Sequence, residues 1–385
     1  MNPRVVYSVG VRFPGGGIGN TASHAVRGLV RQGLLSGLLC GSFRPSDITP
    51  ANLHALGLPS RALRKMAVYD PSGWVDHVYN VLYDAWAARR LPMGDIFWGW
   101  NNYCLRSLAR AKALGMQTVV ERASSHPLTN DRLLREEYAR WGLRFRQPAP
   151  TLTRALAEIH RADHVAIPSD FVRDSFLAEG DAETEGKSAT PLIQTPFGVD
   201  VSRFRPAENS QGERPFRVLF VGQLGIRKGV PDLLEAWQRL GWRDAELWLV
   251  GRVNADLKAI LPQYAHLPSV HFPGHIPDLA ETYRAADVFA FPSIEEGSAL
   301  VTYEALACGL PVVTTYNAGS LVRDALEGFL IPIRDPDALA ARLEGLRADP
   351  ALRREMGAAA RARAEAYTWE HYGDALAEKL RSLAG

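Results

Sequence analysis

Short runs of β-branched and aromatic residues alternate with longer amphipathic stretches over the first half of the chain. Each short apolar run predicts a buried strand, and each stretch with apolar residues every three or four positions predicts a helix. The predicted strands are residues 5–9, 96–99, 118–121 and 164–167, and the predicted helices are residues 21–32, 103–114 and 151–162. Because strands that alternate with helices form parallel sheets, this half is predicted to fold as an α/β domain.

The same alternation starts again after residue 216. Here the predicted strands are residues 218–221, 246–250 and 288–291, and the predicted helices are residues 231–240 and 301–308. Helical periodicity returns at residue 339 and continues to residue 383, with a break near residues 367–369. The predicted fold class is therefore α/β, with two doubly wound Rossmann-like domains that face each other across a cleft at the carboxyl ends of their strands.

Two polar tracts interrupt this pattern. Residues 179–190 are acidic and poor in large apolar side chains, so they are predicted to form an exposed surface loop. Residues 206–215 are also polar and come just before a strongly apolar strand, which predicts the linker between the two domains. We therefore expect one domain at residues 1–205 and a second at residues 206–369.

The composition excludes disordered, collagen-like and small disulfide-rich proteins, because 46% of the 385 residues are hydrophobic and 22% are charged. The three cysteines, Cys40, Cys104 and Cys308, are too widely spaced to suggest a zinc site or a redox pair. The sequence shows neither a signal peptide nor an apolar run long enough to cross a bilayer. We expect a soluble protein of the cytoplasm.

Charge is distributed unevenly although the net charge is only +2. Residues 1–150 contain 19 Lys and Arg against 9 Asp and Glu, so the remaining residues are acidic overall. A basic first domain would attract a phosphorylated acceptor or the anionic inner face of a membrane. Surface arginines that are merely solvated would explain the same count of charges. The basic part shows no aromatic platform or known nucleic-acid motif, so nucleic acid is not an expected partner.

The most informative segment, residues 291–313, has the pattern of a strand, a turn, a helix and another strand. Glu296 falls in the turn, and Glu304 lies eight positions later, within a helix predicted to begin near residue 299. Amide groups at the start of a helix point outward and favour an anion such as a diphosphate. The amides in that position belong to Ser298, Ala299 and Leu300. Two carboxylates beside them would accept hydrogen bonds from the hydroxyl pairs of a nucleotide sugar, whereas an unrelated pair would merely decorate a turn and a wet helix face.

This segment resembles the signature of the retaining glycosyltransferases of family 4, in which two glutamates separated by seven residues contact the nucleotide sugar. It departs from that signature at Ser298 and Ala299, where the family commonly has an aromatic residue followed by glycine. Residues 221–229 resemble the first strand and loop of the family's carboxyl-terminal domain. The resemblance implies that Lys228 reaches the diphosphate, with Arg227 as a second cation, while Gln223 replaces an arginine frequent in the family.

Further segments of both predicted domains resemble the same family, namely residues 196–206, residues 314–332 and the stretch from residue 367 onward. The resemblance implies the two-domain fold called GT-B, with an acceptor-side first domain and a second domain that binds the nucleotide sugar. It also implies that the terminal helix, residues 370–385, crosses back to pack on the first domain.

The resemblance also implies that two features of the first domain belong to the site. Gly16 and Gly17 belong to a glycine-rich loop after the first strand, and the family's corresponding loop lies over the donor diphosphate and the acceptor. The order of the glycines does not match a dinucleotide fingerprint. His126 follows the strand at residues 118–121, where the family often has a histidine near the donor sugar. A lone histidine is otherwise more often a structural hydrogen-bonding group.

The resemblance implies a retaining transfer of a sugar from a UDP- or GDP-sugar to a hydroxyl of a glycan, a lipid-linked acceptor or a small molecule. Glu296, Lys228 and His126 are the expected catalytic residues, Glu304 is expected to bind the ribose, and no metal or other cofactor is expected. Two alternatives remain open, a GT-B sugar-nucleotide epimerase and a non-catalytic protein that binds nucleotide sugars.

Overall fold

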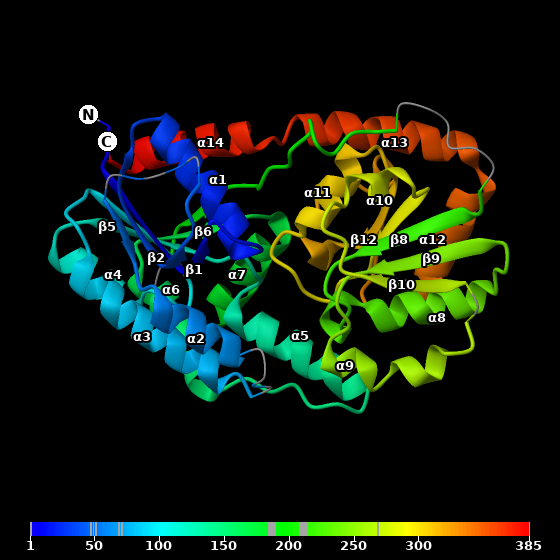
Figure 1. Cartoon of the computed structure of the whole chain (residues 1–385), viewed down its shortest axis with the longest axis horizontal. Helices are drawn as coiled ribbons and strands as arrows, with labels where there is room; N and C mark the ends of the chain where they lie inside the picture. The colour runs from blue at the N-terminus through cyan, green and yellow to red at the C-terminus, as the bar shows by residue number, and fades with distance from the viewer. Residues whose placement is uncertain are drawn as a thin grey trace.

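The computed structural model of the chain describes residues 2–46, 48, 50, 52–67, 70, 72–183, 190–207, 214–267 and 269–384. It contains two parallel sheets that lie side by side with helices above and below each of them (Figure 1). The predicted fold class, two doubly wound α/β units, is therefore confirmed. We call the units the N-lobe and the C-lobe.

The N-lobe is built on a seven-stranded sheet in the order β3-β2-β1-β4-β5-β6-β7. Its strands are β1 (Val5–Phe13), β2 (Leu35–Phe43), β3 (Leu53–Ala55), β4 (Ile96–Trp100), β5 (Gln117–Glu121), β6 (His164–Ile167) and β7 (Leu192–Gln194). Its helices are α1 (Ile18–Arg31), α2 (Leu58–Ala67), α3 (Trp74–Arg90), α4 (Leu105–Ala113), α5 (Pro127–Arg140), α6 (Ala149–Arg161) and α7 (Asp170–Glu183). The predicted strands and helices are present here, with ends that differ by a few residues.

The C-lobe has a six-stranded sheet in the order β10-β9-β8-β11-β12-β13. Its strands are β8 (Phe216–Val221), β9 (Ala245–Val250), β10 (Val270–Gly274), β11 (Val288–Phe291), β12 (Val312–Thr315) and β13 (Gly328–Ile331). The 3-10 segments are η1 (Ile226–Lys228), η2 (Leu261–Tyr264) and η3 (Tyr316–Ala318), and the helices are α8 (Val230–Leu240), α9 (Ala255–Lys258), α10 (Ala280–Arg284), α11 (Leu300–Ala307), α12 (Pro336–Ala348) and α13 (Pro350–Glu365). The last helix of the chain is α14 (Trp369–Ala384).

The strand order reverses at the first strand of each sheet, because β1 lies between β2 and β4 and β8 lies between β9 and β11. Open parallel sheets bind ligands at such a reversal, at the carboxyl ends of the strands. Both strands are apolar and buried, as the central position requires; Val218, Leu219 and Phe220 of β8, for example, have no exposed surface. The candidate site is therefore expected at the two sets of loops that follow these strands.

The chain crosses between the lobes a second time near its end. Helix α13 covers the C-lobe, and α14 continues to the N-lobe, where it lies along α1 (Figure 1). The two helices approach closely at Gly28 and Gly373, since a Cβ atom on Gly28 would lie 2.6 Å from the Cα of Gly373. The rings of His24 and Trp369 stack beside this contact, with centroids 4.0 Å apart.

The two polar tracts have different outcomes. Residues 179–183 continue α7 instead of forming a loop, and the hydroxyl of Thr129 donates to Glu179 Oε1 at 2.7 Å, so this part of the prediction is wrong. Helix propensity is a weak guide that tertiary contacts override, and here the helix continues through Gly180 and Asp181, which made the tract read as a loop. Residues 184–189 of this tract and residues 208–213 of the predicted linker lie outside the described residues. The domain boundary near residue 205 stays a prediction.

No helix in the described part of the chain is long and apolar enough to span a membrane.

The glycine contact between α1 and α14 gives a prediction about stability. Gly28→Ala would place a methyl group against the backbone of Gly373, so we expect a loss of about 1–3 kcal/mol in the free energy of unfolding. Gly345→Ala is the matched control, because Gly345 lies in α12 and a Cβ atom added to it would meet no atom within 4 Å. The control should gain up to about 1 kcal/mol, as alanine favours helices. Urea unfolding of both variants measures the change in the free energy of unfolding. An equal gain in stability in both variants would refute the close packing of α1 against α14.

Candidate functional site

A cavity of about 400 Å³ lies between the lobes, at the loops that follow the central strands of both sheets. We call it the interlobe cavity. Its N-lobe wall includes Asn102, Arg122, Ser124, Asn130 and Tyr138, and its C-lobe wall includes Gln223, Arg227, Lys228, Asn254 and Asp256. The sequence analysis expected the site between the lobes, and the structure puts two of its expected cations, Arg227 and Lys228, in the wall of this cavity.

Glu296 forms the centre of a charge cluster on the C-lobe side. The turn that follows β11 carries Glu296, and η1 carries both Lys228 and Arg227. Arg227 Nη2 donates to Glu296 Oε1 at 3.0 Å, and Lys228 Nζ contacts the same oxygen. Burial lowers the pKa of Lys228 well below its usual value, and the nearby Arg227 charge lowers it further. The structure thus brings Glu296, an expected catalytic residue, together with Lys228 and Arg227, the two cations expected at the diphosphate.

Glu295 is a functional candidate that the sequence analysis did not single out. Its Oε1 accepts hydrogen bonds from Ser124 Oγ at 2.7 Å and from the backbone and hydroxyl groups of Ser125, both at 2.9 Å. Its Oε2 lies 3.3 Å from Arg227 Nε. Burial alone would raise the pKa of Glu295, but Arg227 and these hydrogen bonds outweigh burial and hold the pKa below its usual value. The ionised carboxylate therefore joins the lobes directly. The pair of consecutive glutamates in the turn was the available signal.

The backbone of this turn also touches the N-lobe. A Cβ atom on Gly297 would lie 2.2 Å from the carbonyl of Ala123, so a residue with any side chain would push the two loops apart. The hydroxyl of Ser169 donates to the Gly297 carbonyl at 2.6 Å. The lobes are thus in contact at the turn that carries Glu295 and Glu296.

Glu304 lies apart from this cluster, on α11. Its Oε2 accepts a hydrogen bond from the hydroxyl of Tyr283 at 2.8 Å. Burial raises the pKa of Glu304 to about 7. Glu304 is not one of the described residues that line the interlobe cavity. The expectation that it binds a ribose stays a prediction.

The helix start beside Glu296 differs in one respect from the sequence prediction. The amide of Ala299 donates to the carbonyl of Ala318 at 3.0 Å, so it is not free to bind an anion. The reason is tertiary, because η3 folds over the turn and supplies the acceptor. Leu300 is the first residue of α11, so its amide has no hydrogen-bond acceptor within the helix. The hydroxyl of Ser298 pairs with that of Tyr303 at 2.7 Å, and anion binding by the Ser298 amide stays a prediction.

His126 has a structural task in this arrangement. It caps α5, since the amide of Leu128 donates to its Nδ1 at 3.4 Å. Its ring packs edge-on against Phe176, with centroids 5.0 Å apart. Burial lowers the pKa of His126 to about 4, so the imidazole is neutral near pH 7 with its proton on Nε2. The position after β5 is as expected, and a role at the donor sugar stays a prediction.

Gly16 and Gly17 are exposed in the loop that joins β1 to α1. Gly17 has a φ of 55°, which favours glycine, and a Cβ atom on either residue would meet no atom within 4 Å. The neighbours Gly15 and Gly19 are packed instead, because a Cβ atom on each would lie 2.5 and 2.6 Å from the carbonyl oxygen of Arg12. The loop is therefore open at the two predicted positions, as ligand contact would require.

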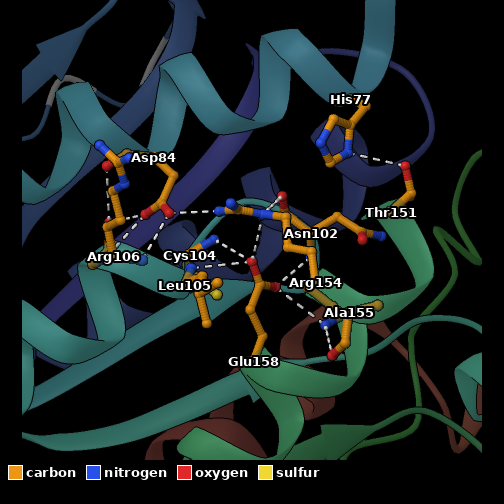
Figure 2. A network of polar contacts seen from close by, with 12 residues as sticks. His77, Asp84, Asn102, Cys104, Leu105, Arg106, Thr151, Arg154, Ala155 and Glu158 are labelled. Atoms are coloured by element: carbon orange, nitrogen blue, oxygen red, sulfur yellow. Dashed lines mark hydrogen bonds and ion pairs between the residues drawn. The ribbon is translucent and has the colours of Figure 1, made fainter. Parts of the chain in front are cut away.

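A buried polar network supports the N-lobe wall of the cavity (Figure 2). Arg154 lies between two buried carboxylates, with Nη2 2.5 Å from Asp84 Oδ2 and Nε 3.1 Å from Glu158 Oε1. Both carboxylates also accept backbone amides at the start of α4, those of Arg106 at 2.7 Å and Cys104 at 3.0 Å. The network fixes the loop between β4 and α4 and so the residues at the edge of the cavity.

The described residues contain no group of three or more His, Cys, Asp or Glu side chains that could hold a metal ion. The expectation of a reaction without a metal stays a prediction.

Comparison with known proteins identifies the family. The family model for "Glycosyl transferases group 1" matches residues 215–349, which include Lys228, Glu296 and Glu304. A D-inositol 3-phosphate glycosyltransferase of Geodermatophilus obscurus is 35% identical over 233 residues, which are 52% of this chain and 49% of that protein. An MMP alpha-(1->4)-mannosyltransferase of Mycolicibacterium hassiacum is 30% identical over 282 residues, which are 70% of this chain and 66% of that protein. The match thus spans about half of the first relative and almost two thirds of the second.

Solved structures agree in fold over the whole chain. Sucrose-phosphate synthase from Thermosynechococcus elongatus superimposes with a TM-score of 0.72 at 21% identity and covers 99% of both chains. HepE from Anabaena, in complex with UDP-glucose, gives a TM-score of 0.68 at 15% identity and covers 98% of this chain and 99% of its own. These likenesses establish the GT-B arrangement of the two lobes. The chain belongs to the group 1 glycosyl transferases.

Proposed function

We propose that the protein is a retaining glycosyltransferase that moves a sugar from a UDP- or GDP-sugar to a hydroxyl of a glycan, a lipid-linked acceptor or a small molecule. The observation that carries this proposal is the pair of cations Lys228 and Arg227 in the wall of the interlobe cavity, both of which contact Glu296 behind them. Relatives named glycosyltransferases and a structural neighbour in complex with UDP-glucose support it.

Charge development explains why cations belong here. In an oxocarbenium-like transition state, negative charge builds on the departing diphosphate, and preorganised cations stabilise it more than they stabilise the ground state. Lys228 and Arg227 supply this charge. Glu296 neutralises both cations while the site is empty, and an incoming diphosphate would share them. The carboxylate of Glu296 would then accept hydrogen bonds from the sugar hydroxyls.

The proton balance needs no base from the protein. On the front-face route, the acceptor hydroxyl attacks the anomeric carbon on the side that the leaving group departs from, and its proton passes to the leaving phosphate oxygen. The low pKa of His126, about 4, agrees with this scheme, since a neutral imidazole donates from Nε2 and does not exchange protons near pH 7. Contact between the lobes would exclude water and limit hydrolysis of the donor.

Glu304 and Lys228 should affect different kinetic parameters. Lys228→Ala should lower kcat by roughly 100-fold, because it removes a contact to charge that develops in the transition state. Glu304→Ala should weaken the binding of the nucleoside diphosphate by roughly tenfold with less effect on kcat, because it removes a ground-state contact. Lys258→Ala, an exposed lysine of α9, is the control. Steady-state kinetics and calorimetric titration measure these effects.

Unchanged kinetics in both variants would refute this site. Incubation of the wild type with donor alone separates the alternatives, since an epimerase converts the sugar without an acceptor. A protein that binds the nucleotide yet transfers no sugar to any acceptor in a cell extract would be a non-catalytic binder.

The raised pKa of Glu304 predicts that nucleotide binding depends on pH. With a pKa of about 7, the carboxyl is mostly ionised at pH 8 and mostly protonated at pH 6. The ionised form accepts two hydroxyl hydrogen bonds, so affinity should fall by roughly tenfold from pH 8 to pH 6. In Glu304→Gln this pH dependence should disappear, and affinity should stay low throughout. A dependence that persists in Glu304→Gln would assign it to another group, such as the nucleotide itself.

We also propose that the N-lobe contacts an anionic membrane through α3. Trp74, Val78 and Leu82 share one face of this helix, with exposed fractions of 51, 46 and 50%. Contiguous apolar side chains on a surface are typical of sites that contact another molecule or a membrane. Arg89 and Arg90 follow at the end of the helix and would pair with anionic lipid headgroups.

Sedimentation with lipid vesicles tests this surface. The wild type should bind phosphatidylglycerol vesicles and not phosphatidylcholine vesicles, and added salt should release it. The double variant Val78→Glu with Leu82→Glu should lose most of this binding. Phe272→Glu, which changes an exposed apolar residue of the C-lobe, should bind as the wild type does. Equal binding by both variants would exclude α3 as the contact.

A further inference from the structure

Arg122 is a buried arginine that the mechanism above does not use. It follows directly after β5, its exposed fraction is 9%, and its side chain forms part of the N-lobe wall of the interlobe cavity. Arg227 and Lys228 belong to the opposite wall. The cavity therefore has cations on two sides.

The neutral groups around Arg122 fix its guanidinium in place. Its Nε donates to the carbonyl of Ser125 at 2.9 Å, and its Nη1 donates to Asn101 Oδ1, also at 2.9 Å. Asn101 is itself held, because its Nδ2 donates to the carbonyl of Ala155 at 3.1 Å and to Glu158 Oε2 at 3.2 Å. Glu158 belongs to the buried network in Figure 2, so Arg122 rests on a rigid support.

Arg122 makes no ion pair with any residue that the structure describes, and its Nη2 has no hydrogen-bond partner among them. Burying an unpaired charge costs free energy, and this cost is visible in the pKa of Arg122, which burial lowers to about 10. Glu295 attracts the guanidinium from a distance. Ser124 and Ser125 already donate to its Oε1, and its Oε2, which accepts no hydrogen bond among the described residues, lies 3.3 Å from Arg227 Nε. A rigid, buried and unpaired cation at a cavity is suited to bind an anion.

The other charges that face the cavity support the same inference. Asp256 is the one carboxylate among the described residues of the wall, and the hydroxyl of Tyr138 donates to its Oδ2 at 2.7 Å. The wall therefore carries three cations against one acid. Neutral amides complete the N-lobe side, including Asn130, whose Nδ2 lies 3.3 Å from Ser124 Oγ. Amide side chains of this kind suit the hydroxyls of a sugar or polyol.

We propose that Arg122 binds an oxyanion group, a phosphate or a carboxylate, on the acceptor, so that the acceptor is an anionic sugar or polyol. This inference rests on the proposed function, in which the donor diphosphate occupies Lys228 and Arg227 of the C-lobe. The diphosphate of the donor would then pair with the cations of the C-lobe wall, and the oxyanion of the acceptor would pair with Arg122 in the N-lobe wall. The acceptor hydroxyl would meet the anomeric carbon between the two walls.

The test is the binding of small anions while the donor site is filled. A thermal-shift screen with UDP, GDP, ADP and dTDP first selects the nucleotide that stabilises the protein. Inorganic phosphate, glucose 6-phosphate, glucuronate and glucose are then titrated by calorimetry at a saturating concentration of that nucleotide. The proteins compared are the wild type, Arg122→Gln, Arg122→Lys and the control Arg110→Gln, which changes an exposed arginine of α4.

We expect the wild type and Arg110→Gln to bind at least one anionic sugar at least tenfold more tightly than glucose. Arg122→Gln should lose this preference while it keeps its affinity for the nucleotide, and Arg122→Lys should keep part of it. The pair of glucose 6-phosphate and glucuronate decides between phosphate and carboxylate. Retained nucleotide binding also shows that Arg122→Gln is folded.

Three results would overturn the proposal. One is a wild type that binds glucose as tightly as both anionic sugars, and another is an Arg122→Gln variant that keeps the preference. The third is a variant that loses nucleotide and anion together while it remains folded by circular dichroism, which would assign Arg122 to the donor. A wild type that binds no nucleotide contradicts the proposed function, whereas the titrations of phosphate and glucuronate, repeated without nucleotide, still test Arg122.

Discussion

The buried carboxylate of Glu295 is the interaction on which the rest of the site depends. It belongs to the C-lobe, and three of its hydrogen-bond donors come from Ser124 and Ser125 of the N-lobe. A carboxylate without partners is costly to bury, so this group is stable in place only while the loop of residues 122–126 remains against it. Gly297 makes the approach possible, because a side chain there would separate the two loops.

Helix α5 ties the lobes together away from this turn. His126 caps its first turn beside the Glu295 contact, and its last residues reach α8 and the loop before α12. Arg140 Nη1 lies 2.6 Å from Asp232 Oδ1, and Arg334 Nε lies 2.6 Å from Glu137 Oε2. Glu137 is fully buried, so the second pair is shielded from salt more than a surface pair would be. One helix thus couples the turn that carries Glu295 and Glu296 to the outer part of the interface.

Two of the three cations in the cavity wall are paired with carboxylates of their own lobe, and Arg122 is the exception. Lys228 and Arg227 are neutralised by Glu296 and Glu295 of their own lobe, which stabilises the two cations in the absence of a diphosphate. The N-lobe contributes a cation without a matching acid. This asymmetry arises because the loops that follow the strands of each sheet line a different wall of the shared cavity.

The local elements could be predicted from the order of the amino acids, whereas the roles expected for Lys228, Arg227 and Glu296 came from the resemblance to a known family. Periodicity indicated the strands of both sheets, and the spacing of Glu296 and Glu304 placed one in a turn and the other in the following helix. Contacts between distant segments became visible only in the folded chain. The bond between Glu295 and Ser124, the closure of η3 over the amide of Ala299, and the lack of a partner for Arg122 all depend on which loops meet, and a pattern of apolar and polar positions contains no information about that.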